Sequence, residues 1–279
     1  MTAPSSVAEL TSRALVAVSG PDWRGFLQGL LTQDVETLGA GEARFAALLT
    51  PQGKLLFDLF VVGRDGGCLL DVAAERRAAL IQRLGLYRLR AKVEIAACDQ
   101  PVLALWPAPP GEAAAGWVAD PRLAALGLRG YGAAAPEGAV RLDEAAYDAH
   151  RLALGAPDPA RDAPSETTYP IEANFDLLGG IDFKKGCFVG QETTSRMKRR
   201  GSIKTRMLPI VFDGPPPPFG AEVLAGSLRA GEVRTGSGGR AMALLRLDRI
   251  EGAALSVDGR PVRVERPSYM AVEEGRAIP

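Results

Sequence analysis

The sequence has 279 residues, of which 47% are hydrophobic and 24% charged, and its 33 basic and 33 acidic residues give no formal net charge. A chain of this length and composition can bury a sizeable core and is expected to form about two or three packed units. A neutral chain exerts no global attraction on nucleic acid or anionic lipid, so any such attraction must be local.

The first residues, MTAPSSVAEL, contain neither the basic nor the apolar region of a signal peptide. No stretch approaches the roughly 18 uninterrupted apolar residues that a membrane span needs. We therefore expect a cytoplasmic, monomeric protein that does not enter a membrane.

The cysteines and the histidine exclude several classes of site. Cys68, Cys98 and Cys187 are widely spaced, which fits neither a disulfide framework nor a paired-cysteine metal site. We expect no resident iron–sulfur cluster, because such a cluster normally needs more cysteine ligands, and no other metal. His150 is the only histidine and lies in a helix-like stretch, so a hydrolytic triad or a zinc centre is not expected.

The first hundred residues alternate between helical and strand-like patterns. Residues 13–35 predict a strand, a turn and a helix whose apolar side chains share one face: Trp23, Phe26, Leu27, Leu30 and Leu31. Three apolar runs punctuated by TPQGK and GRDGG then predict a β-meander, followed by a helix over 73–89 and a strand over 92–97. This mixture indicates an α+β fold rather than a series of βαβ units.

The rest of the chain divides into three further parts. Residues 100–142 predict a small second lobe with a strand at VLALW and a short helix at DPRLAALG. A helix follows with Asp143 as its N-cap and Gly155 just past its end. The short strand-like runs after Arg206 predict a small β-barrel. The expected units are 1–99, 100–142, 143–205 and 206–279.

Two glycine-containing segments resemble phosphate-binding loops without their context. GSGGRA, from Gly236 to Ala241, matches a dinucleotide-binding pattern but lies among strand-like runs, so a hairpin turn is the better interpretation. TPQGK lacks the spacing of a P-loop and is interpreted as a turn between strands. That interpretation leaves Lys54 without a structural role, so Lys54 is a candidate ligand contact.

A basic run with no acidic residue follows Glu192 and consists of Arg196, Lys198, Arg199, Arg200, Lys204 and Arg206. Two interpretations remain open. Cations near the C-terminal end of a helix interact favourably with its dipole. Six of them also suit an anion such as a polyglutamate tail or RNA phosphates.

The segment FKKGCFVGQE presents a cysteine between two glycines. Gly186 and Gly190 permit a sharp bend on which the thiol of Cys187 can be exposed. Lys184, Lys185 and a helix beginning near Gln191 would favour the thiolate if they face the sulfur. We therefore favour a functional rather than a packing role for Cys187.

KGCFVGQE resembles the signature of the YgfZ family of folate-binding proteins, which includes the mitochondrial iron–sulfur assembly factor of aconitase-type enzymes. The upstream segments PIEANFDLLGGIDF and LLTPQGKLLFDLFVV are similar to that family as well, so the resemblance covers nearly the whole chain. It implies the fold of the glycine-cleavage T protein, with α+β lobes around a folate site and a C-terminal β-barrel.

The resemblance also implies a ligand and residue roles. Family members bind tetrahydrofolate, support iron–sulfur enzymes and affect tRNA thiolation. Cys187 would be the functional residue, with Lys185, Gln191 and Glu192 shaping its surroundings at the mouth of the folate cavity. Tyr147 and Asn174 would contact the folate, whereas an aromatic contact of one relative falls on Arg13 and does not carry over.

Departures from the T protein argue against glycine-cleavage chemistry. Ala153 stands where aminomethyltransferases have a glutamate, and the helix beginning AERRAAL lacks the aspartate that they use near the folate. A pterin is usually bound by a carboxylate that accepts hydrogen bonds from two N–H groups. Glu172 or Asp71 would therefore have to replace the missing carboxylates.

The leading hypothesis is a tetrahydrofolate-binding accessory protein for assembly or repair of iron–sulfur clusters, including those of tRNA-modifying enzymes, with an iron–sulfur client or assembly protein as partner. One alternative is a folate-dependent one-carbon transferase with an aminomethyltransferase-like fold. A second is a folate-regulated RNA-binding module that uses the basic run.

Overall fold

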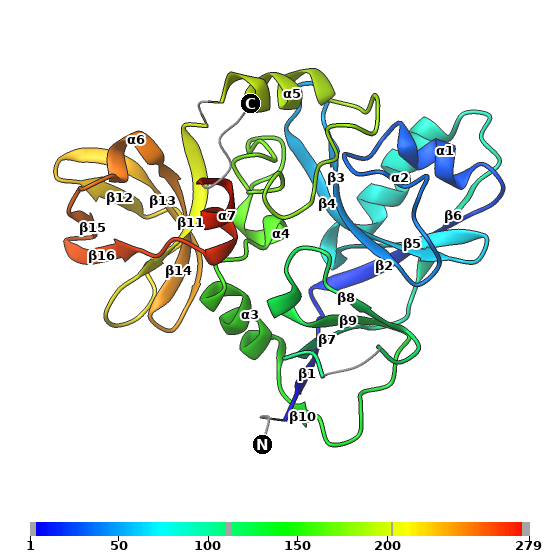
Figure 1. Ribbon diagram of the computed structural model, residues 1–279, viewed down its shortest axis with the longest axis horizontal. Coiled ribbons are helices and arrows are strands. Elements are labelled where there is room, and N and C mark those ends of the chain that lie inside the picture. The colour runs from blue at the N-terminus through cyan, green and yellow to red at the C-terminus, as the bar shows by residue number, and fades with distance from the viewer. Residues whose placement is uncertain (1–3, 110–112, 202, 275–279) are drawn as a thin grey trace.

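The computed structural model describes residues 4–109, 113–201 and 203–274. Its strands form two five-stranded sheets and a closed six-stranded barrel, and helices pack against these layers (Figure 1). The predicted α+β class is therefore confirmed. No helix among these residues has the length and apolar character needed to cross a membrane.

The first sheet has the strand order β3-β4-β5-β2-β6. Its strands are β2 (Arg13–Ser19), β3 (Ala43–Leu49), β4 (Leu55–Arg64), β5 (Gly67–Ala73) and β6 (Glu94–Cys98). Strands β3, β4 and β5 form the predicted meander, with antiparallel neighbours throughout. β4 and β5 are apolar almost without interruption because both faces of this sheet are buried.

Each face of the first sheet packs against a different layer. One face is covered by α1 (Trp23–Gln28) and α2 (Arg77–Arg88), which bury Leu27, Leu80 and Leu84. The short 3₁₀ turn η1 (Ala74–Arg76) leads into α2 and buries no residue. The other face carries Phe45 and Phe60 and packs toward the barrel. The predicted first helix is shorter than expected, but Leu30 and Leu31 still join its core cluster.

The second sheet has the order β10-β1-β7-β9-β8. It consists of β1 (Ser6–Glu9), β7 (Val102–Trp106), β8 (Trp117–Ala119), β9 (Leu128–Tyr131) and β10 (Val140–Arg141). Strand β1 was expected to lie in a first unit over 1–99, but it pairs with β7 and β10 in this sheet. The predicted short helix at DPRLAALG is only a 3₁₀ turn, η2 (Ala124–Leu126).

Helices and turns connect the sheets to the barrel. Helix α3 (Glu144–Ala153) begins where the Asp143 carboxylate accepts the Ala146 N–H at 2.9 Å and ends before Gly155, whose φ is +66°. Helix α4 (Pro159–Asp162) lies near the centre of the molecule, and α5 (Gln191–Arg200) crosses between the barrel and the first sheet (Figure 1).

The C-terminal region is the predicted barrel, with the order β11-β14-β13-β12-β15-β16. Pairing of β11 with β16 closes it. The strands are β11 (Thr205–Val211), β12 (Glu222–Ala225), β13 (Leu228–Ser237), β14 (Arg240–Arg246), β15 (Leu255–Val257) and β16 (Arg260–Val264). Helices α6 (Leu247–Ile250) and α7 (Ser268–Glu274) flank it. GSGGRA forms the hairpin between β13 and β14, as predicted.

Candidate functional site

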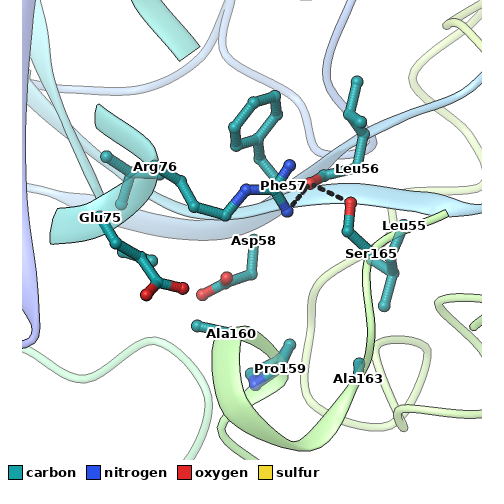
Figure 2. Close-up of a pocket in the computed structure, with 12 residues that line it drawn as sticks. Leu55, Leu56, Phe57, Asp58, Glu75, Arg76, Pro159, Ala160, Ala163 and Ser165 are labelled. Carbon is teal, nitrogen blue, oxygen red and sulfur yellow. Dashed lines mark hydrogen bonds between the residues drawn. The ribbon is translucent and has the colours of Figure 1, made fainter. Parts of the chain in front are cut away.

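A cavity of about 250 Å³ opens between β4, the end of β5, η1 and α4 (Figure 2). Its apolar wall comes from Leu55, Phe57, Val72 and Ala163. Its polar groups are Asp58, Glu75, Arg76 and Ser165. A concave hollow with apolar walls and a few convergent polar groups is the usual form of a small-molecule site.

Asp58 is the buried carboxylate of this cavity, with 6% of its surface exposed. One oxygen accepts a hydrogen bond from the Arg13 guanidinium at 2.8 Å. The other oxygen accepts none from the described residues. Figure 2 shows the carboxylates of Asp58 and Glu75 turned toward one another across the opening. The sequence offered a signal for Asp58, because it is a charge inside the apolar strand LLFDLFVV.

A network of buried charges lies behind Asp58. The Asp71 carboxylate accepts hydrogen bonds from Arg13 Nε at 2.6 Å and from the Tyr131 hydroxyl at 2.9 Å, and it lies 3.5 Å from Arg129. Burial alone would lower the pKa of Arg13, but the carboxylates of Asp58 and Asp71 raise it well above its ordinary value.

These contacts change the interpretation of Asp71 and Arg13. Asp71 is fully buried and its carboxylate is engaged by the protein's own donors, so the geometry does not offer it to a pterin. Arg13 is the cation that holds both Asp58 and Asp71 in place.

Arg129 contributes unpaired donors to a second, small hollow of about 30 Å³ that shares Asp58 and Pro159 with the larger cavity. Its guanidinium is buried and lies 3.8 Å from the centroid of the Phe60 ring. Within the described chain, its Nε and Nη1 have no hydrogen-bond partner. A buried donor without an acceptor is costly, so this position favours a bound acceptor.

Tyr147 also lines the small hollow, as a buried residue of α3. Its ring packs edge-on against Trp106 at 5.3 Å, and its hydroxyl accepts a hydrogen bond from Arg122 at 3.4 Å. Burial raises its pKa, so the phenol is neutral at physiological pH. His150 stacks on Trp106 and its Nε2 lies 2.9 Å from the Ala125 carbonyl, which is the structural role expected for it.

The other predicted folate contacts line neither hollow. Lys54 Nζ donates to the Thr167 carbonyl at 2.6 Å and lies 3.3 Å from the centroid of the Tyr169 ring, so it fastens the loop before Ile171. Asn174 is fully buried and its amide donates to the Met207 carbonyl at 2.7 Å, which ties this loop to the barrel.

Glu172 caps its own turn, because its carboxylate accepts the Tyr169 N–H at 2.9 Å. Burial raises the pKa of this carboxyl group. The carboxylates of Glu172 and Asp71 are thus both engaged by the protein's own donors, whereas one oxygen of Asp58 accepts no hydrogen bond from the described residues.

The predicted cysteine loop lies on the protein surface at the start of α5. Cys187 is exposed, whereas Cys68 is buried and Cys98 is half-buried. Burial raises the pKa of Cys68 to about 12, which makes that thiol inert at neutral pH. Among the three cysteines, Cys187 is the most exposed.

Lys185 anchors this loop. Its ammonium donates to the carbonyls of Gln28, at the end of α1, and Leu31, the latter at 2.6 Å. Burial lowers its pKa to about 8. The sequence led us to expect Lys185 beside the thiol, but its ammonium donates to backbone carbonyls at and just after the end of α1.

Close backbone contact fixes the other side of the loop. Gly190 has a φ of +79°, and a Cβ on it would lie 2.6 Å from the Thr50 carbonyl and 2.9 Å from Gly53. The TPQGK turn is therefore a support for the cysteine loop, and both Gly53 and Gly190 are needed for the approach.

Gln191 and Glu192 line a shallow groove of about 540 Å³ on α5, together with Phe183, Ser195, Lys198 and Arg199. No residue of KGCFVGQE lines the two central hollows. The loop, which we expected at the mouth of a folate cavity, therefore borders neither of these hollows, and the thiol of Cys187 and the buried carboxylate of Asp58 belong to different sites.

The basic run is divided between surface and core. Arg196, Arg199, Arg200 and Lys204 are exposed. Arg206 is buried and pairs with Asp176 at 2.7 Å, and Lys198 lies 3.4 Å from the same carboxylate. Two of the six cations thus contribute to a structural ion pair. The described residues include no cluster of three or more side chains suited to a metal.

Comparisons with known proteins agree with this architecture. Residues 204–272 match the family described as the CAF17 C-terminal beta-barrel domain. The fold resembles a crystal structure of the glycine cleavage system aminomethyltransferase T from Bartonella henselae, with a TM-score of 0.77 and 19% identity over 96% of this chain and 86% of that one. The T-protein-like fold is thereby confirmed.

Sequence relatives give the family. The chain is 33% identical to the human iron–sulfur cluster assembly factor IBA57, mitochondrial, over 87% of this chain and 78% of the human protein. It is 32% identical to the mouse protein of the same name, with the same coverage. The Neurospora crassa homolog is 32% identical over 78% of this chain and 56% of its own length.

These names correct two expectations. The relatives are named mitochondrial, which overturns the predicted cytoplasmic location. These relatives are also named IBA57 rather than YgfZ, so the specific assignment to YgfZ is not supported. On the strength of these relatives, of the barrel and of the T-protein-like fold, the chain belongs to the IBA57 family of iron–sulfur cluster assembly factors.

Proposed function

We propose that this protein assists the assembly or repair of iron–sulfur clusters in client enzymes, with Cys187 as its functional thiol. A reduced folate would bind in the cavity of about 250 Å³ beside Asp58, called here the central cavity. The family supports the role in cluster assembly. The single observation that carries the assignment of the thiol is its exposure on a loop held from both sides, by Lys185 and by Gly190.

The geometry suits transient capture of iron or sulfur. A thiolate is the form of cysteine that binds metals and attacks sulfur, and it must be accessible to do either. Because the loop is already fixed, binding of a partner does not have to be offset against the entropy cost of ordering it. A lone thiol offers one ligand, so the remaining ligands of a cluster would come from a partner protein.

Complementation tests this role. Cells that lack their own IBA57-family protein would receive wild type, Cys187→Ala or the matched control Cys98→Ala, and the activity of a [4Fe–4S] enzyme, including one that thiolates tRNA, would be measured. We expect rescue by wild type and Cys98→Ala and none by Cys187→Ala. Equal rescue by Cys187→Ala at equal protein levels would exclude a role for the thiol.

The central cavity fits the pterin of tetrahydrofolate. Asp58 presents a carboxylate oxygen that no described residue uses, which suits the N–H donors of an aminopyrimidine ring. Arg129, in the adjoining hollow of about 30 Å³, presents two buried donors without acceptors, which suit a single acceptor atom of a ligand that reaches past Asp58. Phe57 supplies apolar contact in the larger cavity, and Tyr147 supplies it in the adjoining hollow. When bound, tetrahydrofolate supplies or accepts one-carbon units.

Calorimetric titration tests the ligand. Loss of one charge-assisted hydrogen bond is worth about 1.5–3 kcal/mol, so Asp58→Asn should weaken tetrahydrofolate binding about 10-fold to 100-fold. Asp65→Asn, in the exposed turn after β4, is the matched control. Circular dichroism would establish that both variants are folded. Equal affinity of Asp58→Asn and wild type would remove Asp58 from the ligand site.

One observation favours a second candidate, a folate-dependent one-carbon transferase. Asp58 and Glu75 face the same cavity, and paired carboxylates can act as acid and base. Turnover of methylene-tetrahydrofolate with an amine or thiol acceptor, lost in Glu75→Gln, would establish it. The RNA-binding alternative retains only the exposed cations of the basic run, and steep salt dependence of RNA affinity would be its mark.

A further inference from the structure

We propose that the end of α2 and the turn after it form a docking surface for an acidic segment of a partner protein. This surface, called here the α2 patch, consists of Arg83, Leu86, Arg88, Leu89, Arg90 and Lys92. It lies in the half of the molecule away from the barrel (Figure 1) and shares no residue with the central cavity or the cysteine loop.

Charge is concentrated in this segment. Residues 76–93 contain six basic residues and no acidic one, in a chain that is neutral overall. Two of these cations have structural partners: Arg76 donates to the Leu56 carbonyl at 2.8 Å, and Arg77 pairs with Asp99 at 2.8 Å.

The other four cations belong to the α2 patch. The side chains of Arg83, Arg88, Arg90 and Lys92 make no ion pair or hydrogen bond with any residue that the structure describes. The nearby carboxylate of Asp22 instead accepts the backbone N–H of Lys92 at 2.7 Å. The patch therefore presents positive charge that the protein does not neutralise itself.

Two large apolar side chains lie among these cations. Leu86 is 67% exposed and Leu89 is 88% exposed. The packing face of α2 is supplied by other residues, since Leu80 and Leu84 are completely buried against the first sheet. Leu86 and Leu89 therefore do not contribute to the hydrophobic core.

The backbone at Leu89 is unusual as well. Its φ is +44° and its ψ is −108°, a backbone conformation that residues other than glycine rarely adopt. Helices commonly end with glycine where φ is positive. A leucine here costs about 1–3 kcal/mol of strain and makes little contact in return, which points to a use outside the chain.

An acidic protein segment fits this surface better than lipid or RNA does. A membrane-bound helix lies with a continuous apolar face in the lipid, but that face of α2 is buried in the protein. Single-stranded RNA is bound through exposed aromatic side chains, and the one aromatic residue of the segment, Tyr87, packs against the core. Apolar contacts ringed by arginines are typical of protein interfaces.

Site-specific photo-cross-linking tests the proposal. A photoreactive phenylalanine analogue at position 86 of the full chain would be illuminated in cells, and the cross-linked peptide would be identified by mass spectrometry. We expect one protein segment rich in Asp and Glu that also carries apolar side chains. The same analogue at Leu228, an exposed leucine of the barrel, should not cross-link to this segment.

Charge dependence is the second arm. With the identified segment as a synthetic peptide, binding to Arg88→Glu/Arg90→Glu should be about tenfold weaker than to wild type. Raising the salt from about 0.1 M to about 1 M, which shortens the Debye length from about 10 Å to about 3 Å, should weaken wild-type binding too. Equal binding by the charge-reversed variant would overturn the proposal.

Leu89→Gly keeps the test independent of folding. Glycine suits the backbone at this position, so the variant should be at least as stable as wild type while the cross-link from position 86 falls. Cross-linking to lipid or RNA, to several unrelated proteins, or to none would equally overturn the proposal, as would preferential binding of the protein to vesicles that contain phosphatidylserine.

Discussion

The central cavity and the cysteine loop place their reactive groups differently, one in the interior and the other at the surface. In the cavity, arginines and aspartates from four strands are buried together, and they leave one carboxylate oxygen and two arginine donors unused. In the loop, a lysine and two glycines hold a thiol at the surface. The first arrangement is suited to a small polar ligand, whereas the second is suited to a protein partner.

The largest effect on stability is expected in the central network. Asp71→Asn removes the carboxylate that Arg13 and Tyr131 contact, so it leaves buried charge unpaired. We expect a loss of about 3–5 kcal/mol in the free energy of unfolding, measured in urea. Asp99→Asn, whose parent side chain is 88% exposed and pairs with Arg77, should lose less than about 1 kcal/mol. Similar losses for both would contradict the proposed role of the network.

A smaller effect is expected at Gly190. Alanine there would clash with the Thr50 carbonyl, so Gly190→Ala should cost about 3 kcal/mol and disturb the cysteine loop. Gly186 also has a positive φ but has open space around it, so Gly186→Ala should cost only about 1 kcal/mol. Urea unfolding and the rate of Cys187 alkylation would report both changes, and an equal cost at the two sites would show that the backbone contact is unimportant.

Lys185 adds a pH dependence to the loop. Its pKa is about 8 in the folded protein and near 10.5 in the unfolded chain, so between these values the unfolded state binds the extra proton. Stability therefore rises as pH increases from about 8 toward 10.5, by about 1 kcal/mol after solvent screening. The difference in unfolding free energy between wild type and Lys185→Met should follow that rise. A pH-independent difference would show that the ammonium is not desolvated.

The smallest effect is expected on the exposed face of α5. Arg200→Gln should change the free energy of unfolding by less than about 0.5 kcal/mol, because this side chain is exposed. Thermal unfolding of the variant beside wild type is sufficient to measure it. A loss above about 1 kcal/mol would place Arg200 in a structural network like that of the cavity.

Local features of both regions could be predicted from the sequence. The cysteine loop, the helix that begins at Gln191 and the cap at Asp143 depend on neighbouring residues, and their patterns are visible in a short window. The barrel was predictable because alternating apolar runs between turns indicate strands without regard to their partners.

The polar network could not be predicted, because it joins side chains that are far apart in the chain. Arg13, Asp58, Asp71 and Arg129 come from four different strands, and only the packing of the two sheets brings them together. The sequence did contain a weaker signal, since Asp58 and Asp71 interrupt apolar strands. Lys185 and Lys54 were misjudged for the same reason: their acceptors are backbone carbonyls of distant segments.

The most direct test of the separation between thiol and cavity is the affinity of Cys187→Ala for tetrahydrofolate, measured by titration calorimetry beside wild type. Because Cys187 lines neither central hollow, the two dissociation constants should agree within about twofold, even though we expect the variant not to rescue the client enzyme. A tenfold or greater loss of affinity, about 1.4 kcal/mol, would place the thiol in the folate site and contradict the separation.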